Sequence, residues 1–124
     1  MNKTASYSER KTFVQYDENH VLLYLNEQPA EITNEVTGET EQGYSYTGTM
    51  PDGGTLIEAA NVTDENRRAK FISGLLGLEY DIDAQIAILA NGDDTNEHAE
   101  EKAIFMENRR IVKNAVDELL AREI

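Results

Sequence analysis

Hydrophobic and polar residues follow two different periods along this chain, and the change falls near residue 60. Before it, short runs rich in β-branched and aromatic residues alternate with polar residues. The pattern is clearest at 44–50, where Tyr44 and Tyr46 share one strand face while serine and threonine occupy the other. Such alternation predicts strands at the following ranges: 11–16, 21–25, 30–36, 44–50 and 55–60.

Turn-forming sequences separate these strands. DENH at 17–20 joins the first two ranges into a hairpin, and TGETEQG at 37–43 contains two glycines that can adopt positive φ. PDGG at 51–54 places a proline, whose φ is already fixed for a turn, before two further glycines. We therefore expect an antiparallel β-meander of about four or five strands in the first half of the chain.

In the second half, apolar residues recur every three or four positions, which is the period of an amphipathic helix. The first helix follows NVTDEN, where Thr63 or Asp64 can accept hydrogen bonds from free N–H groups of the first turn. Gly77 is expected to end it. A second helix begins at Asp81, a good N-cap, and stops at the Asn-Gly pair 91–92.

The third predicted helix is the longest and runs from about residue 95 to residue 122. Asp94 is its expected N-cap, with Glu97 three residues later as in a capping box. Consecutive apolar residues at 103–105, 115–116 and 119–120 widen its apolar surface, because neighbouring helical residues lie about 100° apart. We expect part of that surface to stay uncovered and to form an interface. The alternative is that the sheet covers it and leaves a monomer.

These patterns predict an α+β fold, in which a small antiparallel β-meander is followed by three α-helices. A chain of 124 residues can form one ordinary domain with a hydrophobic core. We therefore treat residues 1–124 as a single domain, with a β-rich part at 1–60 and a helical part at 61–124.

The formal net charge of −13 narrows the choice of partners. Both halves of the chain are acidic and repel phosphate, so neither nucleic acid nor an anionic membrane surface is an expected partner. No apolar run approaches the ~18 residues needed to cross a bilayer, and the N-terminus lacks the apolar stretch of a signal peptide. Cysteine is absent, which excludes disulfides and thiol chemistry. We expect a cytoplasmic or virion-associated protein.

The acidic segment 91–101, NGDDTNEHAEE, is the strongest candidate for metal chemistry. An EF-hand loop would need glycine at its sixth position, where counting from Asp93 gives His98. His98 and Glu101 are spaced to share a metal ion, but two ligands do not make a site. We therefore interpret the segment as a helix stop followed by a helix cap, and we predict neither a metal ion nor a cofactor.

No motif in the sequence indicates catalysis. The four serines lack the Gly-x-Ser-x-Gly surround of a nucleophile elbow, and no glycine-rich stretch matches a phosphate-binding loop. None of the acidic residues lies in an apolar, aromatic context that would raise its pKa for acid–base work. We expect a non-enzymatic protein.

Candidate contact residues come from the strand and helix faces described above. The two tyrosines of 44–50 fit either core packing or a partner surface, since tyrosine is common in both. The apolar period of the third helix adds candidates of the same kind. The possible partner-binding residues are Tyr44, Tyr46, Phe105, Val112, Val116 and Leu119.

Residues 67–120 combine a short helix, a tyrosine, a helix with an Ile-Ala-Ile-Leu core and an asparagine stop, and a longer helix bearing an aromatic, an arginine and a lysine. The residues that carry this pattern are Phe71, Tyr80, Ile86, Ala87, Ile88, Leu89, Asn91, Phe105, Arg109 and Lys113. In this they resemble small accessory proteins of tailed bacteriophages and prophages, including tail-fibre assembly-like proteins. TGETEQGYSYTG is also similar to strand-turn-strand segments of such proteins. The resemblance implies a structural or assembly role and supplies no catalytic motif.

The sequence therefore favours a non-enzymatic phage- or prophage-derived structural or assembly protein that acts through protein–protein contacts. It either self-associates or binds a protein partner. The alternative is an acidic inhibitor that binds a nucleic-acid-handling protein, since a chain of this charge complements a basic surface.

Overall fold

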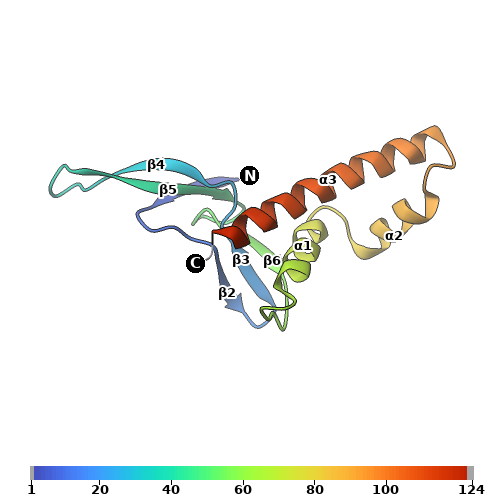
Figure 1. The fold of residues 1–124 in the computed structure, drawn as a ribbon, viewed down its shortest axis with the longest axis horizontal. Helices are drawn as coiled ribbons and strands as arrows, with labels where there is room; N and C mark the ends of the chain where they lie inside the picture. The colour runs from blue at the N-terminus through green and yellow to red at the C-terminus, as the bar shows by residue number, and fades with distance from the viewer. Residues whose placement is uncertain (1, 123–124) are drawn as a thin grey trace.

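A computed structural model describes residues 2–122, and within them six strands precede three helices (Figure 1). The α+β prediction is therefore confirmed, as is the order of strands before helices. The strands are β1 (Lys3–Tyr7), β2 (Phe13–Asp17), β3 (His20–Leu23), β4 (Gln28–Thr33), β5 (Thr40–Gly48) and β6 (Thr55–Glu58). The helices are α1 (Arg67–Gly77), α2 (Ile82–Asn91) and α3 (Asn96–Ala121).

The strands form two three-stranded antiparallel sheets rather than one meander. One sheet has the order β1-β5-β4, and the other has the order β2-β3-β6. The chain leaves the second sheet after β3, builds β4 and β5, and returns with β6 beside β3 (Figure 1). β1 was not predicted, because its sequence KTASY contains few β-branched or aromatic residues. Only its pairing with β5, from Lys3↔Gly48 to Tyr7↔Tyr44, identifies it as a strand.

The β4–β5 hairpin projects from the body of the molecule (Figure 1). Its turn lies at 34–39, earlier than the predicted turn at 37–43, because β4 ends at Thr33 and β5 begins at Thr40. The side chain of Asn34 accepts the backbone N–H of Val36 at 2.9 Å, and Gly38 has a φ of +74°. An asparagine that bonds two residues ahead, followed by a glycine with positive φ, closes the hairpin.

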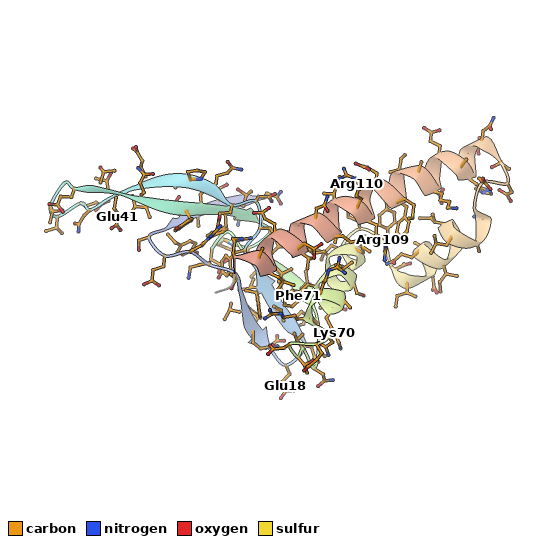
Figure 2. All side chains as sticks on the ribbon, viewed as in Figure 1. Glu18, Glu41, Lys70, Phe71, Arg109 and Arg110 are labelled. Carbon is orange, nitrogen blue, oxygen red and sulfur yellow. The ribbon has the colours of Figure 1, made fainter. Side chains whose placement is uncertain are left out.

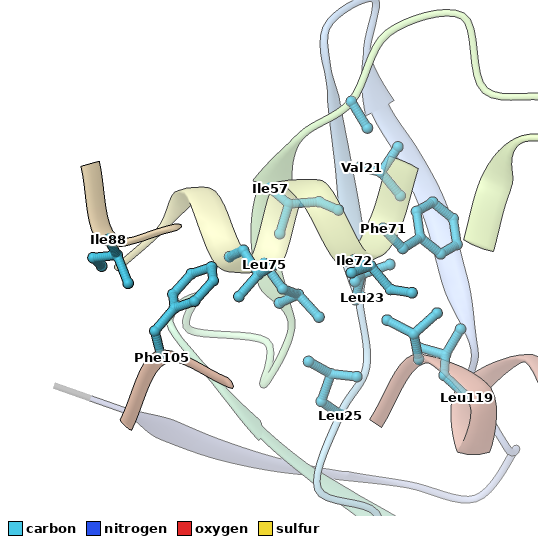
Figure 3. Packing of buried hydrophobic residues seen from close by; sticks show 13 residues of the cluster. Val21, Leu23, Leu25, Ile57, Phe71, Ile72, Leu75, Ile88, Phe105 and Leu119 are labelled. Carbon is cyan, nitrogen blue, oxygen red and sulfur yellow. The ribbon is translucent and has the colours of Figure 1, made fainter. Parts of the chain in front are cut away.

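The main core lies between the β2-β3-β6 sheet, α1 and α3 (Figure 3). Phe71 of α1 is fully buried and meets Phe13 edge-on, with ring centroids 4.9 Å apart. A Cβ on Gly74 would lie 2.8 Å from Ile57 Cδ1 and 2.9 Å from the carbonyl oxygen of Glu58. Gly74 therefore lets α1 approach β6 closely, and this packing role explains a glycine inside a helix.

Local capping fixes the helix ends. Asp81 Oδ1 accepts the N–H of Ala84 at 2.7 Å, and Gly92 ends α2 with a φ of +57°, so both predicted boundaries of α2 are confirmed. α3 is capped by Thr95, whose Oγ1 accepts the N–H of His98 at 3.1 Å. The predicted cap, Asp94, is wrong by one residue, because its carboxylate bonds the ring of His98 instead.

The first helix also starts later than predicted. Thr63 and Asn66 bond each other's backbone N–H groups through their side chains, at 3.3 Å and 2.7 Å, and close a separate turn. α1 then begins at Arg67. None of the helices in residues 2–122 is both long enough and apolar enough to span a membrane.

Candidate protein-contact surface

Most of the residues that sequence reasoning proposed for partner contact belong to the core. The side chains of Tyr46, Phe105, Val116 and Leu119 are buried. Val112 and Tyr44 are partly buried and pack against the two core clusters. A partner cannot reach the four buried side chains in this structure, so we correct their assignment from contact residues to core residues.

Tyr46 of β5 is buried, and it belongs to a polar network that includes Lys11 before β2, Glu27 after β3 and Arg122 at the end of α3. Its hydroxyl donates to Glu27 Oε2 at 2.8 Å and accepts the backbone N–H of Lys11 at 2.8 Å. The guanidinium of Arg122 lies over its ring, 5.4 Å from the centroid, and also bonds Glu27 at 3.2 Å. Burial raises the pKa of Tyr46, so the phenol stays a neutral hydrogen-bond donor. The network is structural.

A second polar group, around Asp52, has the same character. The Tyr24 hydroxyl donates to Asp52 Oδ2 at 2.9 Å, and Gly54 N–H donates to Oδ1 at 2.9 Å. Burial, with the hydrogen bond to Asp52, raises the pKa of Tyr24 to about 12. A phenol with that pKa is neither a base nor an anionic nucleophile at neutral pH. This arrangement therefore holds the turn before β6 and offers no evident chemistry.

Exposed apolar residues of the helical part lie on α3, at Ile104, Met106 and Ile111, at Leu78, and in a row on α2. Ile82, Ile86 and Leu89 are spaced i, i+4, i+7 and so fall on one side of the helix. Their exposed fractions are 74%, 60% and 53%. We call these three residues the α2 stripe. A single exposed side chain of this kind is common in proteins, but a row of them on one helix face is a candidate contact surface.

The opposite side of α2 holds the helix in place. Ile88 is buried and belongs to the same core cluster as Phe105 of α3 (Figure 3). Tyr80, just before α2, packs edge-on against Phe105 with centroids 5.0 Å apart, and its hydroxyl accepts the side-chain amide of Asn108 at 2.9 Å. These contacts fix which side of α2 faces the protein. The α2 stripe is consequently turned away from it.

A groove of about 650 Å³ runs beside the start of α2. We call it the α1–α2 groove. Its walls come from β6, α1, the connecting loop and α2, and they include Leu56, Gly77, Leu78, Tyr80 and Ile82. Nothing lies within 4 Å of the position that a Cβ would take on Gly77. Leu78 and Ile82 are exposed, so the groove is open to solvent and continuous with the α2 stripe at Ile82.

Acidic residues line the groove and are frequent in the chain segment that contains α2. Residues 79–101 contain eight carboxylates and neither lysine nor arginine; these are Glu79, Asp81, Asp83, Asp93, Asp94, Glu97, Glu100 and Glu101. The groove itself is lined by Glu58, Asp81 and Asp83. His20 lines it too, with its ring Nδ1 2.8 Å from Asp17 Oδ1. The surface thus combines apolar side chains with negative charge.

Comparison with family models, curated proteins and solved structures gives no match.

The segment 91–101 acts as a helix junction. Asn91 and Gly92 end α2, and Thr95 caps α3. The ring Nδ1 of His98 contacts the carboxylate of Asp94, four residues earlier in the chain. Between residues 2 and 122, no group of three or more His, Asp or Glu side chains is arranged to hold a metal ion.

Sequence reasoning missed the α2 stripe for an identifiable reason. Both the stripe and Ile88 are apolar, and the stripe has the more regular helical spacing. Periodicity alone therefore does not show which of these residues faces the core and which is exposed. Phe105 of α3 determines which side of α2 is buried, because Ile88 packs in the same core cluster. The position of Phe105 follows from tertiary packing and not from the period of α2.

Proposed function

We propose that this chain is a non-enzymatic protein that acts through protein–protein contact, with the α2 stripe and the α1–α2 groove as its contact surface. The observation that carries this proposal is the exposure of Ile82, Ile86 and Leu89 on a helix whose other side is already anchored. Full burial of an exposed Ile or Leu side chain gains about 1.5–3 kcal/mol. Three such residues supply binding energy that must exceed the cost of association.

α2 is held in a fixed orientation, which favours specific binding of a partner over non-specific hydrophobic association. α2 is capped at both ends, with Asp81 at its start and Gly92 after its last residue. Ile88 and Tyr80 hold it against α3. A surface presented in one orientation loses less conformational freedom when a partner binds, which improves affinity.

A structural or assembly role in a phage or prophage is a proposal of the same kind. It rests on the resemblance of residues 67–120 to tail-fibre assembly-like proteins, and assembly factors act by transient protein contact. The apolar surface on α2 supports a contact role of this type, whichever protein the partner is.

A second candidate is an acidic inhibitor of a nucleic-acid-handling protein. The observation that favours it is the run of eight carboxylates without a cation at 79–101. Such a run complements a basic surface that would otherwise bind phosphate. The two candidates differ in one measurable respect. An oligonucleotide should displace the inhibitor from its partner, whereas it should leave an assembly contact intact.

Two measurements test the contact surface. Sedimentation velocity at tens of micromolar detects self-association. Fluorescence anisotropy then detects binding to a labelled, uncharged amphipathic peptide of about 18 residues, since shorter isolated helices are marginal in water. We expect at least one of them to be positive. We further expect Ile82→Gln/Ile86→Gln to weaken that association by about tenfold or more, because tenfold corresponds to only 1.4 kcal/mol.

The matched control is Ile104→Gln/Ile111→Gln, which removes two exposed isoleucines from α3 and leaves α2 untouched. The control should retain the association. A chain that stays monomeric and binds no amphipathic peptide would refute the proposal. Equal losses in both double variants would move the contact surface to α3.

A further inference from the structure

We propose that the α1–α2 groove and the α2 stripe receive an amphipathic helix of another protein, which carries lysine or arginine beside its apolar residues. This inference rests on the proposed function and adds the chemistry of the partner. The negative charges around the groove, together with its apolar residues, indicate this kind of partner.

Among residues 2–122, the carboxylates of the groove form no salt bridge with lysine or arginine, although Lys70 lines the adjoining pocket together with Glu58. Glu58 and Asp83 are exposed and, among residues 2–122, have no lysine or arginine as an ion-pair partner. Asp81 uses one carboxylate oxygen for the N–H of Ala84. The three carboxylates therefore share one groove that neither lysine nor arginine lines, and a ligand that brings positive charge is attracted to it.

The same charges argue against a second copy of this chain as the occupant. A symmetric contact between two α2 stripes would place two segments of eight carboxylates against each other. Each chain also carries a net charge of −13, which opposes close approach. Like charges across an interface reduce affinity, so the surface selects against self-association and in favour of a basic partner.

The shape of the surface fits a helix. From Ile82 to Leu89 the stripe extends about 10 Å, which equals about two helical turns. Its i, i+4, i+7 spacing matches the anchor spacing of a helix laid alongside it. On the α1 side of the groove, Ser73 has a small side chain and Gly77 has none, which leaves room for a second helix. A partner helix in this position would place its flanking cations near Glu58, Asp81 and Asp83.

Three peptides of the same length and apolar face test the inference, with their flanking positions filled by lysine, glutamine or glutamate. Binding to the intact chain is measured by fluorescence anisotropy at low and high salt. We expect the lysine peptide to bind at least tenfold more tightly than the glutamine peptide and the glutamate peptide not to bind. Added salt should weaken the lysine peptide most, because exposed charges are screened.

Two charge variants locate the effect. Glu58→Gln/Asp81→Asn/Asp83→Asn removes the groove carboxylates, and asparagine at 81 still caps α2. It should lower the affinity for the lysine peptide about tenfold and leave the glutamine peptide unchanged. The control replaces three carboxylates of the projecting β4–β5 hairpin, on which Glu41 lies (Figure 2), with the same change in net charge. The control is Glu31→Gln/Glu39→Gln/Glu41→Gln, and it should bind all peptides as the native chain does. Circular dichroism shows whether both variants keep the fold.

The outcomes separate the two proposals. Equal binding of all three peptides would support the contact surface and overturn the requirement for a basic partner. A stable dimer formed through the α2 stripe would do the same. Equal losses in the groove and hairpin variants would mean that the lysine peptide responds only to net charge, and would overturn the inference. No binding by any peptide, together with no self-association, would overturn the proposed function as well.

Discussion

Arg122 should contribute strongly to stability, although it lies at the end of the last helix. Its side chain is only 3% exposed. It donates to the carbonyl oxygens of Lys11 at 2.8 Å and Tyr24 at 2.7 Å, and to Glu27 Oε2 at 3.2 Å. Its Nε is the only buried side-chain nitrogen or oxygen in the described part of the chain without a hydrogen-bond partner. One guanidinium thus joins the end of α3 to the segments before β2 and after β3.

Arg122→Met would remove these bonds while keeping an apolar stem of similar length. Two carbonyl groups would lose a donor, and each buried acceptor left unsatisfied costs about 1–3 kcal/mol. Glu27 would keep Arg10 and Tyr46 as donors, so the larger penalty of an unpaired buried charge does not apply in full. We therefore expect a loss of about 2–4 kcal/mol in the free energy of unfolding.

Urea denaturation followed by circular dichroism measures this loss. With a slope of about 2 kcal/mol per molar urea, the midpoint should fall by about 1–2 M. Arg10→Met is the matched control, because Arg10 bonds the same carboxylate from a position that is 45% exposed. An exposed ion pair contributes about 0.2–1 kcal/mol. If the two variants lose the same stability, or if Arg122→Met loses less than Arg10→Met, the reasoning about burial is refuted.

Three further predictions follow from single contacts. Thr95→Ala should cost about 0.5–2 kcal/mol as a lost N-cap, and more than Asp94→Ala, when both are measured by urea denaturation. Stability should fall in acid as Glu27 is protonated, because hydrogen bonds from Arg10 and Tyr46 outweigh burial and lower its pKa. Because folding lowers the pKa of Glu27, its ionised carboxylate stabilises the fold at pH values above its ordinary pKa near 4.5, and this stabilisation is lost as the pH falls. The free energy of unfolding of Glu27→Gln should therefore depend less on pH in acid. Tyr24, with a pKa of about 12, stabilises the fold below pH 10 and loses this effect as pH rises from 10 to 12. Absorbance at 295 nm should accordingly lack the component near pH 12 in Tyr24→Phe.

The sequence predicts the elements of this fold better than their arrangement. α2 was located to the residue at both ends, because an aspartate cap and an Asn-Gly stop are local signals. The division into two sheets could not be predicted, because β6 pairs with β3 across more than thirty residues, and strand patterns do not encode such pairing. β1 was missed for the same reason, since only its contact with β5 identifies it.

The candidate site was predicted less well. The uncovered apolar surface was expected on the third helix, where Ile104, Met106 and Ile111 are exposed, whereas the exposed row on α2 was not predicted and the contact residues chosen were mainly core residues. Tyr46 and Phe105 are aromatic, and aromatic residues suit a core and an interface equally well. The sequence places Arg122 at the end of the third helix without indicating that its side chain is buried. Its burial depends on the carbonyl groups of Lys11 and Tyr24, which no local pattern places beside it.

The orientation of α2 is the structural feature on which the contact proposal depends, and stability measurements can test it without a partner. If Ile88 faces α3 as the structure has it, Ile88→Ala should cost about 2–4 kcal/mol through lost burial and a residual cavity. Ile86 is already 60% exposed, so Ile86→Gln should change stability by at most about 0.5 kcal/mol. Glutamine also keeps a good helix propensity, so α2 itself should persist. Urea denaturation of both variants gives the comparison directly. If Ile86→Gln were as destabilising as Ile88→Ala, α2 would pack through its stripe in solution, and the surface proposed for the partner would belong to the core.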